Sequence, residues 1–236
     1  MNRVFKLTLL AFLVFVHAQS IPVIARDFSP MKRILVLGDS LSAGFGLKSS
    51  QAWPALITEK LRTAGMNFEI TNASQTGGTT AGGLERLPVH LKRKSAIRTE
   101  SSHGEIDIFI LELGINDAFR GVSIAQVRNN LQAIIDLVKA RNPNVKIIVA
   151  GMQLPNYTED DYVFAFGQLY GDVAAKNNAA LIPYLLEGVG GDPNLNQPDH
   201  IHPNAAGQRI LAENVWRVLE PIAREVATGQ TAAHVQ

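Results

Sequence analysis

Short apolar runs alternate with longer helical patterns along most of this chain, from about residue 31 onward. The apolar runs are four to eight residues long and rich in β-branched side chains, a pattern typical of strands that are buried on both faces. The clearest run is residues 106–113, with the sequence IDIFILEL. The pattern predicts five strands, at residues 33–37, 68–71, 106–113, 145–150 and 180–184.

The segments between these runs place apolar residues three and four positions apart, which is the spacing of one helix face. Residues 123–141 show it best, with Val127, Leu131, Ile134 and Val138 on one face. Five helices are predicted, at residues 53–64, 80–94, 123–141, 164–177 and 204–226, and Pro221 is expected to interrupt the last of them.

Strands that alternate with helices favour an α/β fold with a single doubly wound, flavodoxin-like sheet of five parallel strands and helices on both faces. In such a sheet the carboxyl ends of the strands meet at one edge, where ligands bind. We expect residues 31–228 to form this one domain, because the chain has no internal repeat and its 236 residues, 46% of them apolar, suffice for one core. Residues 229–236 are expected to fray.

The first eighteen residues differ from the rest of the chain. Arg3 and Lys6 precede a run, residues 7–16, that is almost wholly apolar, and residues 16–18 then offer small or apolar residues at the two cleavage positions. This order is typical of a secretory signal peptide, with cleavage after residue 18 or as late as residue 25, and the run is too short to span a bilayer. An N-terminal strand or core helix is the alternative, but the irregular residues 19–30 separate the run from the fold. We therefore expect an exported protein, periplasmic or secreted, without stable membrane insertion.

Cysteine is absent from the sequence. Its absence excludes disulfides, thiolate catalysis, zinc–thiolate sites and a lipidated N-terminal cysteine. Cleavage at residue 18 removes two basic residues and no acidic one, which leaves 20 basic against 21 acidic residues. A nearly neutral protein does not owe its function to nucleic acid or an anionic membrane, so we expect neither as a partner. We also expect a monomer whose partner is a small molecule.

Polar or glycine-containing segments follow four of the five predicted strands. They are GDSLS at residues 38–42, TGG at 76–78, GIND at 114–117 and DHIHPN at 199–204. Because the carboxyl ends of parallel strands meet at one edge of a sheet, we expect these segments to converge there.

These segments contain a possible nucleophile and its base. The hydroxyl of Ser40 is a poor nucleophile at neutral pH unless an imidazole takes its proton and a carboxylate orients that imidazole. Asp199 lies three residues before His202, in one short turn, and can fix its tautomer. Other interpretations are open: Ser40 could cap a helix, His200 could serve in place of His202, and Asp199 with both histidines could bind a metal, although no further ligand cluster accompanies them.

The four segments, in this order, resemble the SGNH/GDSL hydrolase family, which is named for its Ser, Gly, Asn and His. Within it the chain is most similar to the branch of secreted acyl esterases that contains thioesterase I/lysophospholipase and arylesterases. The resemblance covers about residues 33–222. It extends to the motifs AWPAL at 52–56, NAS at 72–74 and LPNY at 154–157.

The resemblance implies a role for one or more residues of each segment. Ser40 would be the nucleophile, His202 the general base selected by the family's Asp-x-x-His-Pro pattern, and Asp199 the carboxylate that orients it. The backbone N–H groups of Ser40 and Gly77 and the side-chain amide of Asn116 would form the oxyanion hole. Neither a cofactor nor a metal is implied.

Glycine positions affect the geometry expected at this edge. Gly38 would let the chain turn sharply off the first strand and expose the hydroxyl of the nucleophile. Either Gly77 or its neighbour Gly78 can supply the oxyanion N–H. Many relatives have a glycine where Ile115 stands, so the loop that carries Asn116 is expected to be stiffer here.

The resemblance predicts a serine hydrolase of carboxylic esters or thioesters that works through an acyl-enzyme on Ser40. Compatible substrates are acyl and aryl esters, lysophospholipids and acyl thioesters. Phe119, Leu154 and Tyr157 lie on loops at the same rim, where their apolar side chains would contact an acyl chain. Two other functions are compatible with the sequence: a carbohydrate acetylesterase with the same machinery, and a non-catalytic protein that binds a small ligand at this rim.

Overall fold

Five parallel strands form one sheet in the computed structural model, which describes residues 31–92, 105–155 and 161–229. The strands are β1 (Lys32–Gly38), β2 (Phe68–Asn72), β3 (Ile108–Glu112), β4 (Lys146–Ala150) and β5 (Ala180–Ile182). Their order in the sheet is β2-β1-β3-β4-β5, so the winding direction changes between β1 and β3, as in flavodoxin-like folds. The predicted α/β fold class is confirmed.

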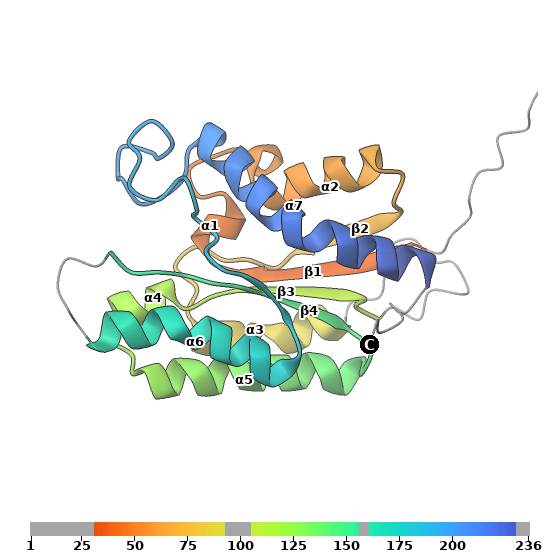
Figure 1. The fold of residues 1–236 in the computed structure, drawn as a ribbon, viewed down its shortest axis with the longest axis horizontal. Coiled ribbons are helices and arrows are strands. Elements are labelled where there is room, and N and C mark those ends of the chain that lie inside the picture. The colour runs from red at the N-terminus through yellow and green to blue at the C-terminus, as the bar shows by residue number, and fades with distance from the viewer. Residues whose placement is uncertain (1–30, 93–104, 156–160, 230–236) are drawn as a thin grey trace, which may run out of the picture.

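Helices cover both faces of this sheet. The longer ones are α2 (Trp53–Thr63), α3 (Thr80–Lys92), α5 (Ile124–Arg141), α6 (Asp161–Asn177) and α7 (Ala205–Thr228). Figure 1 shows α2 and α7 on one face and α3, α5 and α6 on the other. The structure also has three short elements that the sequence pattern did not predict: α1 (Ser40–Ala43) and the 3-10 helix η1 (Ser49–Gln51), both before α2, and α4 (Ile115–Phe119), before α5.

Helix α7 runs through Pro221 as one element, so the predicted interruption is wrong. Pro221 lies on the exposed side of the helix, as does Arg217, whose carbonyl group loses its partner because proline has no N–H. Leu219 and Ala223 on either side of it are fully buried, and their packing holds both halves against the same core. At the start of the helix the side chain of Asn204 accepts hydrogen bonds from two N–H groups of the first turn.

Three strands are shorter than predicted: β4 by one residue, and β3 and β5 by more. Asp107 lies in a bend before β3, where its carboxylate accepts a hydrogen bond from the N–H of Arg33 at 2.7 Å and pairs with Lys32 at 3.2 Å. Strand β5 ends before Pro183, which has no N–H group with which to continue the ladder. Side-chain and proline effects of this kind set strand ends more strongly than the length of the apolar run does.

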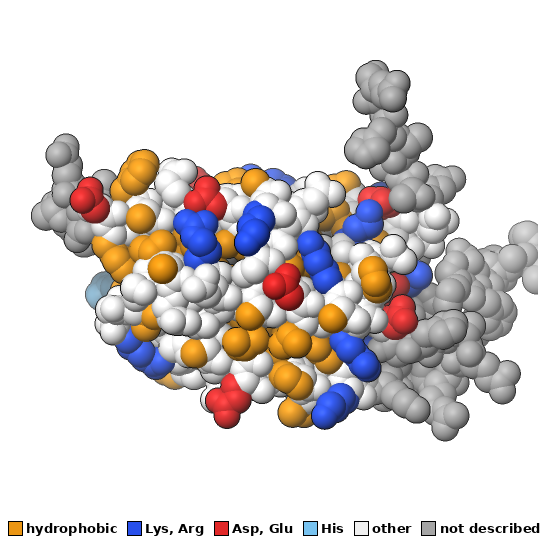
Figure 2. Space-filling view, turned by 90° about the horizontal axis from the view of Figure 1, so that it is seen from below, with side chains coloured by type: hydrophobic (Ala, Val, Ile, Leu, Met, Phe, Trp, Pro, Cys, Tyr) orange, Lys and Arg blue, Asp and Glu red, His pale blue; other side chains and the backbone are white. Residues whose placement is uncertain are grey.

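The central strands carry the core. All five residues of β3 are buried, as are six of the seven in β1, which fits their continuous apolar runs. Figure 2 shows the outer side of the helices below the sheet, where basic and acidic side chains are interspersed with small apolar groups. Over the ranges that the structure describes, every helix is too short or too polar to cross a membrane. The predicted signal peptide, residues 19–30 and residues 230–236 lie outside those ranges.

The carboxyl ends of the strands lie at one end of the molecule, on the left in Figure 1. Helices α1 and α4 lie at this end, together with the loop of residues 183–204 that leads from β5 to α7. All four segments singled out in the sequence therefore border the same edge of the sheet.

Candidate active site

Ser40, His202 and Asp199 form one continuous line of hydrogen bonds at this edge. Nε2 of His202 lies 3.0 Å from Oγ of Ser40, and its Nδ1 lies 2.8 Å from Oδ2 of Asp199. Ser40 is the first residue of α1, whereas His202 comes 162 positions later, in the turn before α7. The fold thus brings an alcohol, an imidazole and a carboxylate from distant segments within bonding reach of one another.

A tight turn holds Asp199 and His202 in this geometry. Oδ1 of Asp199 accepts hydrogen bonds from the N–H groups of Ile201 and His202, each at 3.0 Å. Hydrogen bonds from the backbone and ring of His202, and then from Ile201, lower the pKa of Asp199 to about 2, so this carboxylate is ionised at neutral pH. Its Oδ2 can accept a hydrogen bond from Nδ1–H of His202, which leaves Nε2 facing Ser40 to take its proton. The rival His200 is exposed and has a φ of 58°.

Gln197 ties this turn to the loop that follows α1. Its N–H donates to the carbonyl of His202 at 2.7 Å, and its side-chain amide donates to the carbonyls of Phe45 at 2.6 Å and Pro203 at 3.1 Å. The ring of Phe45 packs against the imidazole of His202, with centroids 4.5 Å apart. The sequence analysis missed Gln197 and Phe45 because neither belongs to a motif, and their contacts exist only where two loops meet.

The turn at Ser40 differs from the one expected for Gly38. Gly38 has no positive φ, so it does not supply an unusual turn. A Cβ at this position would lie only 2.5 Å from Oε2 of Glu112, and that close approach is what requires glycine. The predicted physical reason is therefore wrong, although the need for glycine stands. Asp39 shapes the turn, because its carboxylate accepts a hydrogen bond from the N–H two residues on at 2.9 Å and caps α1.

Gly77 and Gly78 lie in the turn beside the end of β1. The φ of Gly77 is 71°, a conformation that strains any other residue. The N–H of Gly78 already donates to the carbonyl of Gln75 at 2.9 Å. In the described part of the chain the N–H of Gly77 has no acceptor. The hydrogen bonding therefore favours Gly77 over Gly78 as a donor to a bound substrate.

Asn116 joins this turn to the nucleophile turn. Its side-chain amide donates to Oδ2 of Asp39 at 3.0 Å and to the carbonyl of Gly78 at 3.1 Å. Ile115 stands before it as the first residue of α4 and has an ordinary φ, because Gly114 carries the positive φ of 130°. The isoleucine therefore does not strain the loop that presents Asn116.

Asp117 braces the start of α4 against α3. Its carboxylate accepts hydrogen bonds from the backbone N–H of Thr80 at 2.8 Å and from the Thr80 hydroxyl at 2.6 Å. The same hydroxyl accepts a hydrogen bond from Asn130 on α5 at 2.9 Å. Asp117 thus fixes the helix that carries Asn116.

Two buried carboxyl groups lie beside the nucleophile turn. Asp39 and Glu112 are both fully buried. Burial raises the pKa of Asp39 to about 6, and burial together with the charge of Asp39 raises the pKa of Glu112 well above its usual range. The guanidinium of Arg86 interacts electrostatically with both and donates to the carbonyl of Gly38 at 2.7 Å. The sequence analysis missed Glu112, although a glutamate inside the apolar run IDIFILEL was a signal.

We expect wild-type protein to lose stability relative to an Asp39→Asn variant as the pH rises from about 4 to about 6. The pKa of Asp39 is about 6 in the folded protein against an ordinary 3.8, so in this window the folded state keeps a proton that the unfolded chain has released. The stability from this difference is present below pH 4 and is lost as the pH rises through 6. Urea denaturation at several pH values should show an extra loss on the order of 2 to 3 kcal/mol in wild type. Equal pH dependence in the two proteins would contradict the expectation.

A pocket of about 630 Å³ opens onto Ser40 and His202. The structure places Phe119 and Leu154 in its wall, while Tyr157 lies outside the described residues. Apolar side chains from α4, from the loop after β4 and from the segment after β5 make up most of this wall. They are Ile115, Phe119, Leu154, Pro155, Leu186 and Ile201, with the ring of Tyr184 beside them.

No cluster suited to a metal ion is present in residues 31–92, 105–155 and 161–229, taking three or more His, Asp or Glu side chains as the requirement. Asp199 and His202 instead bond to each other and to Ser40. The metal interpretation of this segment therefore gains no support.

Comparison with known proteins gives a consistent result. Residues 36–210 match the GDSL-like lipase/acylhydrolase family. The chain is 42% identical to the esterase TesA of Pseudomonas aeruginosa over 189 residues, which cover 80% of this chain and 88% of that protein. It is 34% identical over 189 residues to thioesterase 1/protease 1/lysophospholipase L1 of Escherichia coli, covering 80% and 84%. A crystal structure of TesA matches with a TM-score of 0.72 and 41% identity, covering 81% of this chain and 99% of that one.

Proposed function

Since the chain belongs to the GDSL-like lipase/acylhydrolase family and is a hydrolase of carboxylic esters or thioesters, we propose that it works through an acyl-enzyme on Ser40. The observation that carries the proposal is the hydrogen-bonded line from Ser40 through His202 to Asp199, with distances of 3.0 and 2.8 Å. A hydroxyl in this setting can lose its proton to the imidazole at the moment of attack, which makes it a competent nucleophile at neutral pH.

Each half-reaction moves one proton through His202. In the first, Nε2 of His202 takes the proton of Ser40 as Oγ bonds to the substrate carbonyl carbon. The bond to the leaving group then breaks, and the alcohol or thiol departs with that proton. In the second, water gives a proton to His202 and adds to the acyl carbon, and Ser40 leaves with the proton. Asp199 stabilises the imidazolium in both halves and stays ionised.

Three donors would hold the negative oxygen of the tetrahedral intermediate. They are the backbone N–H groups of Ser40 and Gly77 and the side-chain amide of Asn116. In the described part of the chain neither N–H has an acceptor, so both are available to substrate. Asn116 shares its amide protons with Asp39 and the carbonyl of Gly78, and an oxyanion is a stronger acceptor than that carbonyl. Loss of one such donor typically lowers the rate on the order of 100- to 1,000-fold.

The pocket favours an acyl group longer than acetyl. Its volume is about 630 Å³, and apolar side chains that include Phe119 and Leu154 form most of its wall. A two-carbon acyl group would leave most of this surface in contact with water, whereas a longer chain would bury it. This feature weighs against the carbohydrate acetylesterase. The intact Ser40–His202–Asp199 line weighs against a protein that only binds a ligand.

We also propose that the protein is exported. The support is the basic start and apolar run within residues 1–18, a segment whose structure is not described. The hydrolase domain of residues 31–228 would then act in the periplasm or outside the cell on small-molecule esters or thioesters, as a monomer and without nucleic acid.

A chromogenic organophosphonate tests the acyl-enzyme directly. Wild-type protein should release about one equivalent of leaving group and gain one phosphonyl group on the peptide that contains Ser40, as read by mass spectrometry. A series of chromogenic esters from acetate to palmitate should give a higher kcat/KM for medium or long chains than for acetate. Wild-type protein that stays unlabelled, under conditions that label a control serine hydrolase, would remove Ser40 from the mechanism. A preference for acetate would contradict the proposed acyl specificity.

A further inference from the structure

Glu112, the last residue of β3, holds the segment that carries the nucleophile. Its Oε2 accepts a hydrogen bond from the backbone N–H of Asp39 at 3.0 Å and one from the hydroxyl of Ser42 at 2.5 Å. These two residues flank Ser40 on either side along the chain. A single buried oxygen atom therefore fixes the segment before and after the reactive hydroxyl.

The direction of the Ser42 hydrogen bond follows from a third residue. The indole Nε1 of Trp53 donates to Oγ of Ser42 at 3.1 Å, and an indole N–H can only donate. The hydroxyl proton of Ser42 is thus left for Glu112. Both Trp53 and Ser42 are fully buried, so water does not compete for these bonds.

The backbone beside Glu112 is shaped to admit it. Strand register places Gly38 opposite Glu112, and a Cβ on Gly38 would lie 2.5 Å from Oε2. Glycine at this position leaves room for the carboxyl group. The first residue of the GDSL motif is therefore explained by the contact with Glu112, a residue outside the motif.

The influence of Glu112 extends to the oxyanion site. Asp39, whose backbone Glu112 holds, accepts a hydrogen bond from the side-chain amide of Asn116 at 3.0 Å. Resting on the function proposed above, we propose that Glu112 is a positioning residue for the reaction: by fixing Asp39 and Ser42 it sets the place of the Ser40 hydroxyl and, through Asp39, that of the Asn116 amide.

Burial and the neighbouring charges favour the neutral acid of Glu112, rather than its carboxylate, as the form that braces the nucleophile segment. It interacts electrostatically with Asp39, Arg86 and Tyr170, and burial raises its pKa well above the usual range. In the neutral acid, the proton sits on Oε1, because Oε2 already accepts two hydrogen bonds. Oε1 is buried and has no partner among the described residues, so Oε2 alone makes the two bracing bonds. Glutamine keeps the shape and one carbonyl oxygen, so it should replace Glu112 with little loss.

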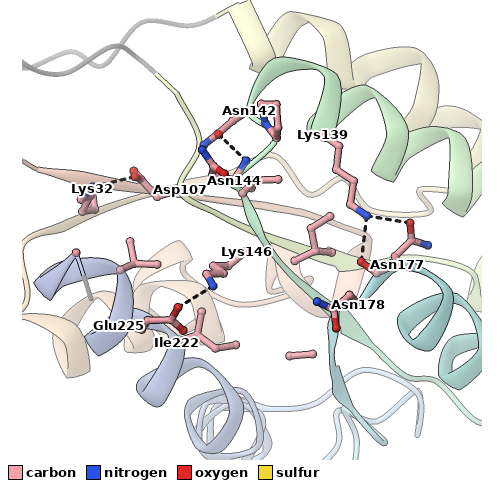
Figure 3. Close-up of a pocket in the computed structure, with 16 residues that line it drawn as sticks. Lys32, Asp107, Lys139, Asn142, Asn144, Lys146, Asn177, Asn178, Ile222 and Glu225 are labelled. Carbon is pink, nitrogen blue, oxygen red and sulfur yellow. Dashed lines mark hydrogen bonds and ion pairs between the residues drawn. The ribbon is translucent and has the colours of Figure 1, made fainter. Parts of the chain in front are cut away.

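The matched control lies at the other end of the sheet, in the cleft drawn in Figure 3. Asn177, at the end of α6, exchanges hydrogen bonds with Gln132 and donates to the carbonyl of Val173 at 2.9 Å, and it is 8% exposed. Lys139 also donates to it there. An Asn177→Leu variant therefore loses buried hydrogen bonds, as a Glu112→Leu variant does, but far from Ser40.

The experiment compares Glu112→Leu, Glu112→Gln, Ser42→Ala and Asn177→Leu with wild type. Steady-state hydrolysis of a chromogenic ester gives kcat and KM, organophosphonate gives the rate of Ser40 labelling, and thermal unfolding gives stability. Glu112→Leu should lower kcat and the labelling rate about 10- to 100-fold with KM within about threefold, because a small displacement of a reacting group costs this much. Ser42→Ala should lower both about 10-fold, and Glu112→Gln should stay near wild type. Asn177→Leu should lose stability and keep kcat.

The following outcomes would overturn the positioning role of Glu112. Wild-type kcat in a folded Glu112→Leu or in Ser42→Ala would do so. So would equal losses in Glu112→Gln and Glu112→Leu, or an Asn177→Leu variant that loses kcat as much as they do. If Glu112→Leu does not fold, Ser42→Ala alone decides, because it removes the hydroxyl that donates to Glu112 and accepts from Trp53 but leaves the carboxyl group in place. Ser40→Ala, assayed alongside, keeps the two proposals apart: turnover by that variant contradicts the function itself, whereas an inactive Ser40→Ala beside an unaffected Ser42→Ala contradicts only the role of Glu112.

Discussion

Replacing Ser40 with alanine should lower kcat by about 10⁴- to 10⁶-fold and leave the protein folded. Only Oγ is lost, and its hydrogen bond is to His202, which keeps its own place through Asp199. The pocket beside the site is unchanged, so KM for any residual reaction should stay close to the wild-type value. Hydrolysis of a chromogenic ester by equal amounts of folded wild type and variant measures the ratio.

Ser49 offers a matched control for this substitution. It lies nine positions after Ser40, in η1, and its side chain is exposed. Ser49→Ala removes the same atom from a serine close in sequence and should leave kcat within about twofold, as surface substitutions usually do. Equal turnover by Ser40→Ala and wild type would eliminate the acyl-enzyme, and equal losses in both variants would point to a general effect on folding.

The sheet was predictable from the sequence because its strands are buried on both faces. Residues 106–113 and 145–150 contain continuous apolar runs, and such runs with helices between them leave few possible topologies. The positions of Ser40, Asn116 and His202 followed from the same argument, since each comes after a strand whose carboxyl end faces one edge. The backbone order alone brings these residues together.

The details within that edge were not predictable in the same way. Helices α1 and α4 are four and five residues long, too short for a periodic pattern. Gly38 was expected to relieve a turn, whereas it gives room to Glu112, a residue 74 positions away that joins the site only through strand register. Pro221 was expected to break α7, but buried side chains on both sides of it outweigh one lost hydrogen bond. For Gly38 and Pro221, tertiary contacts override what the local sequence suggests.

The contact between Gln197 and the loop after α1 is of the same kind. Gln197 bonds to the carbonyls of Phe45 and His202, residues that lie on two different loops. Such a residue belongs to no sequence motif and to no periodic hydrophobic pattern, so the sequence alone does not identify it. Loop-to-loop bonds therefore had to come from the structure, and here they hold the backbone of His202 while Asp199 bonds to its ring.

Replacing His202 with glutamine should lower kcat by about 10⁴- to 10⁶-fold, nearly as much as the loss of Ser40. Glutamine has no group that can take a proton from Oγ and return it to the leaving group, so the hydroxyl of Ser40 stays a weak nucleophile. Because the two residues act as one unit, a double variant that combines Ser40→Ala with His202→Gln should be no slower than either single variant. Steady-state hydrolysis of the same chromogenic ester by all three proteins measures this.

His200 supplies the control, two residues away in the same turn. Its φ of 58° is one that asparagine tolerates, so His200→Asn should preserve the turn and keep kcat within about threefold. This comparison separates the specific base from a histidine that merely lines the pocket, because both variants remove an imidazole from the same six-residue segment. If His200→Asn loses activity as His202→Gln does, the turn rather than the base is at fault. If His200→Asn alone is inactive, the assignment of the base to His202 is wrong, and the 3.0 Å contact with Ser40 is not the one used in catalysis.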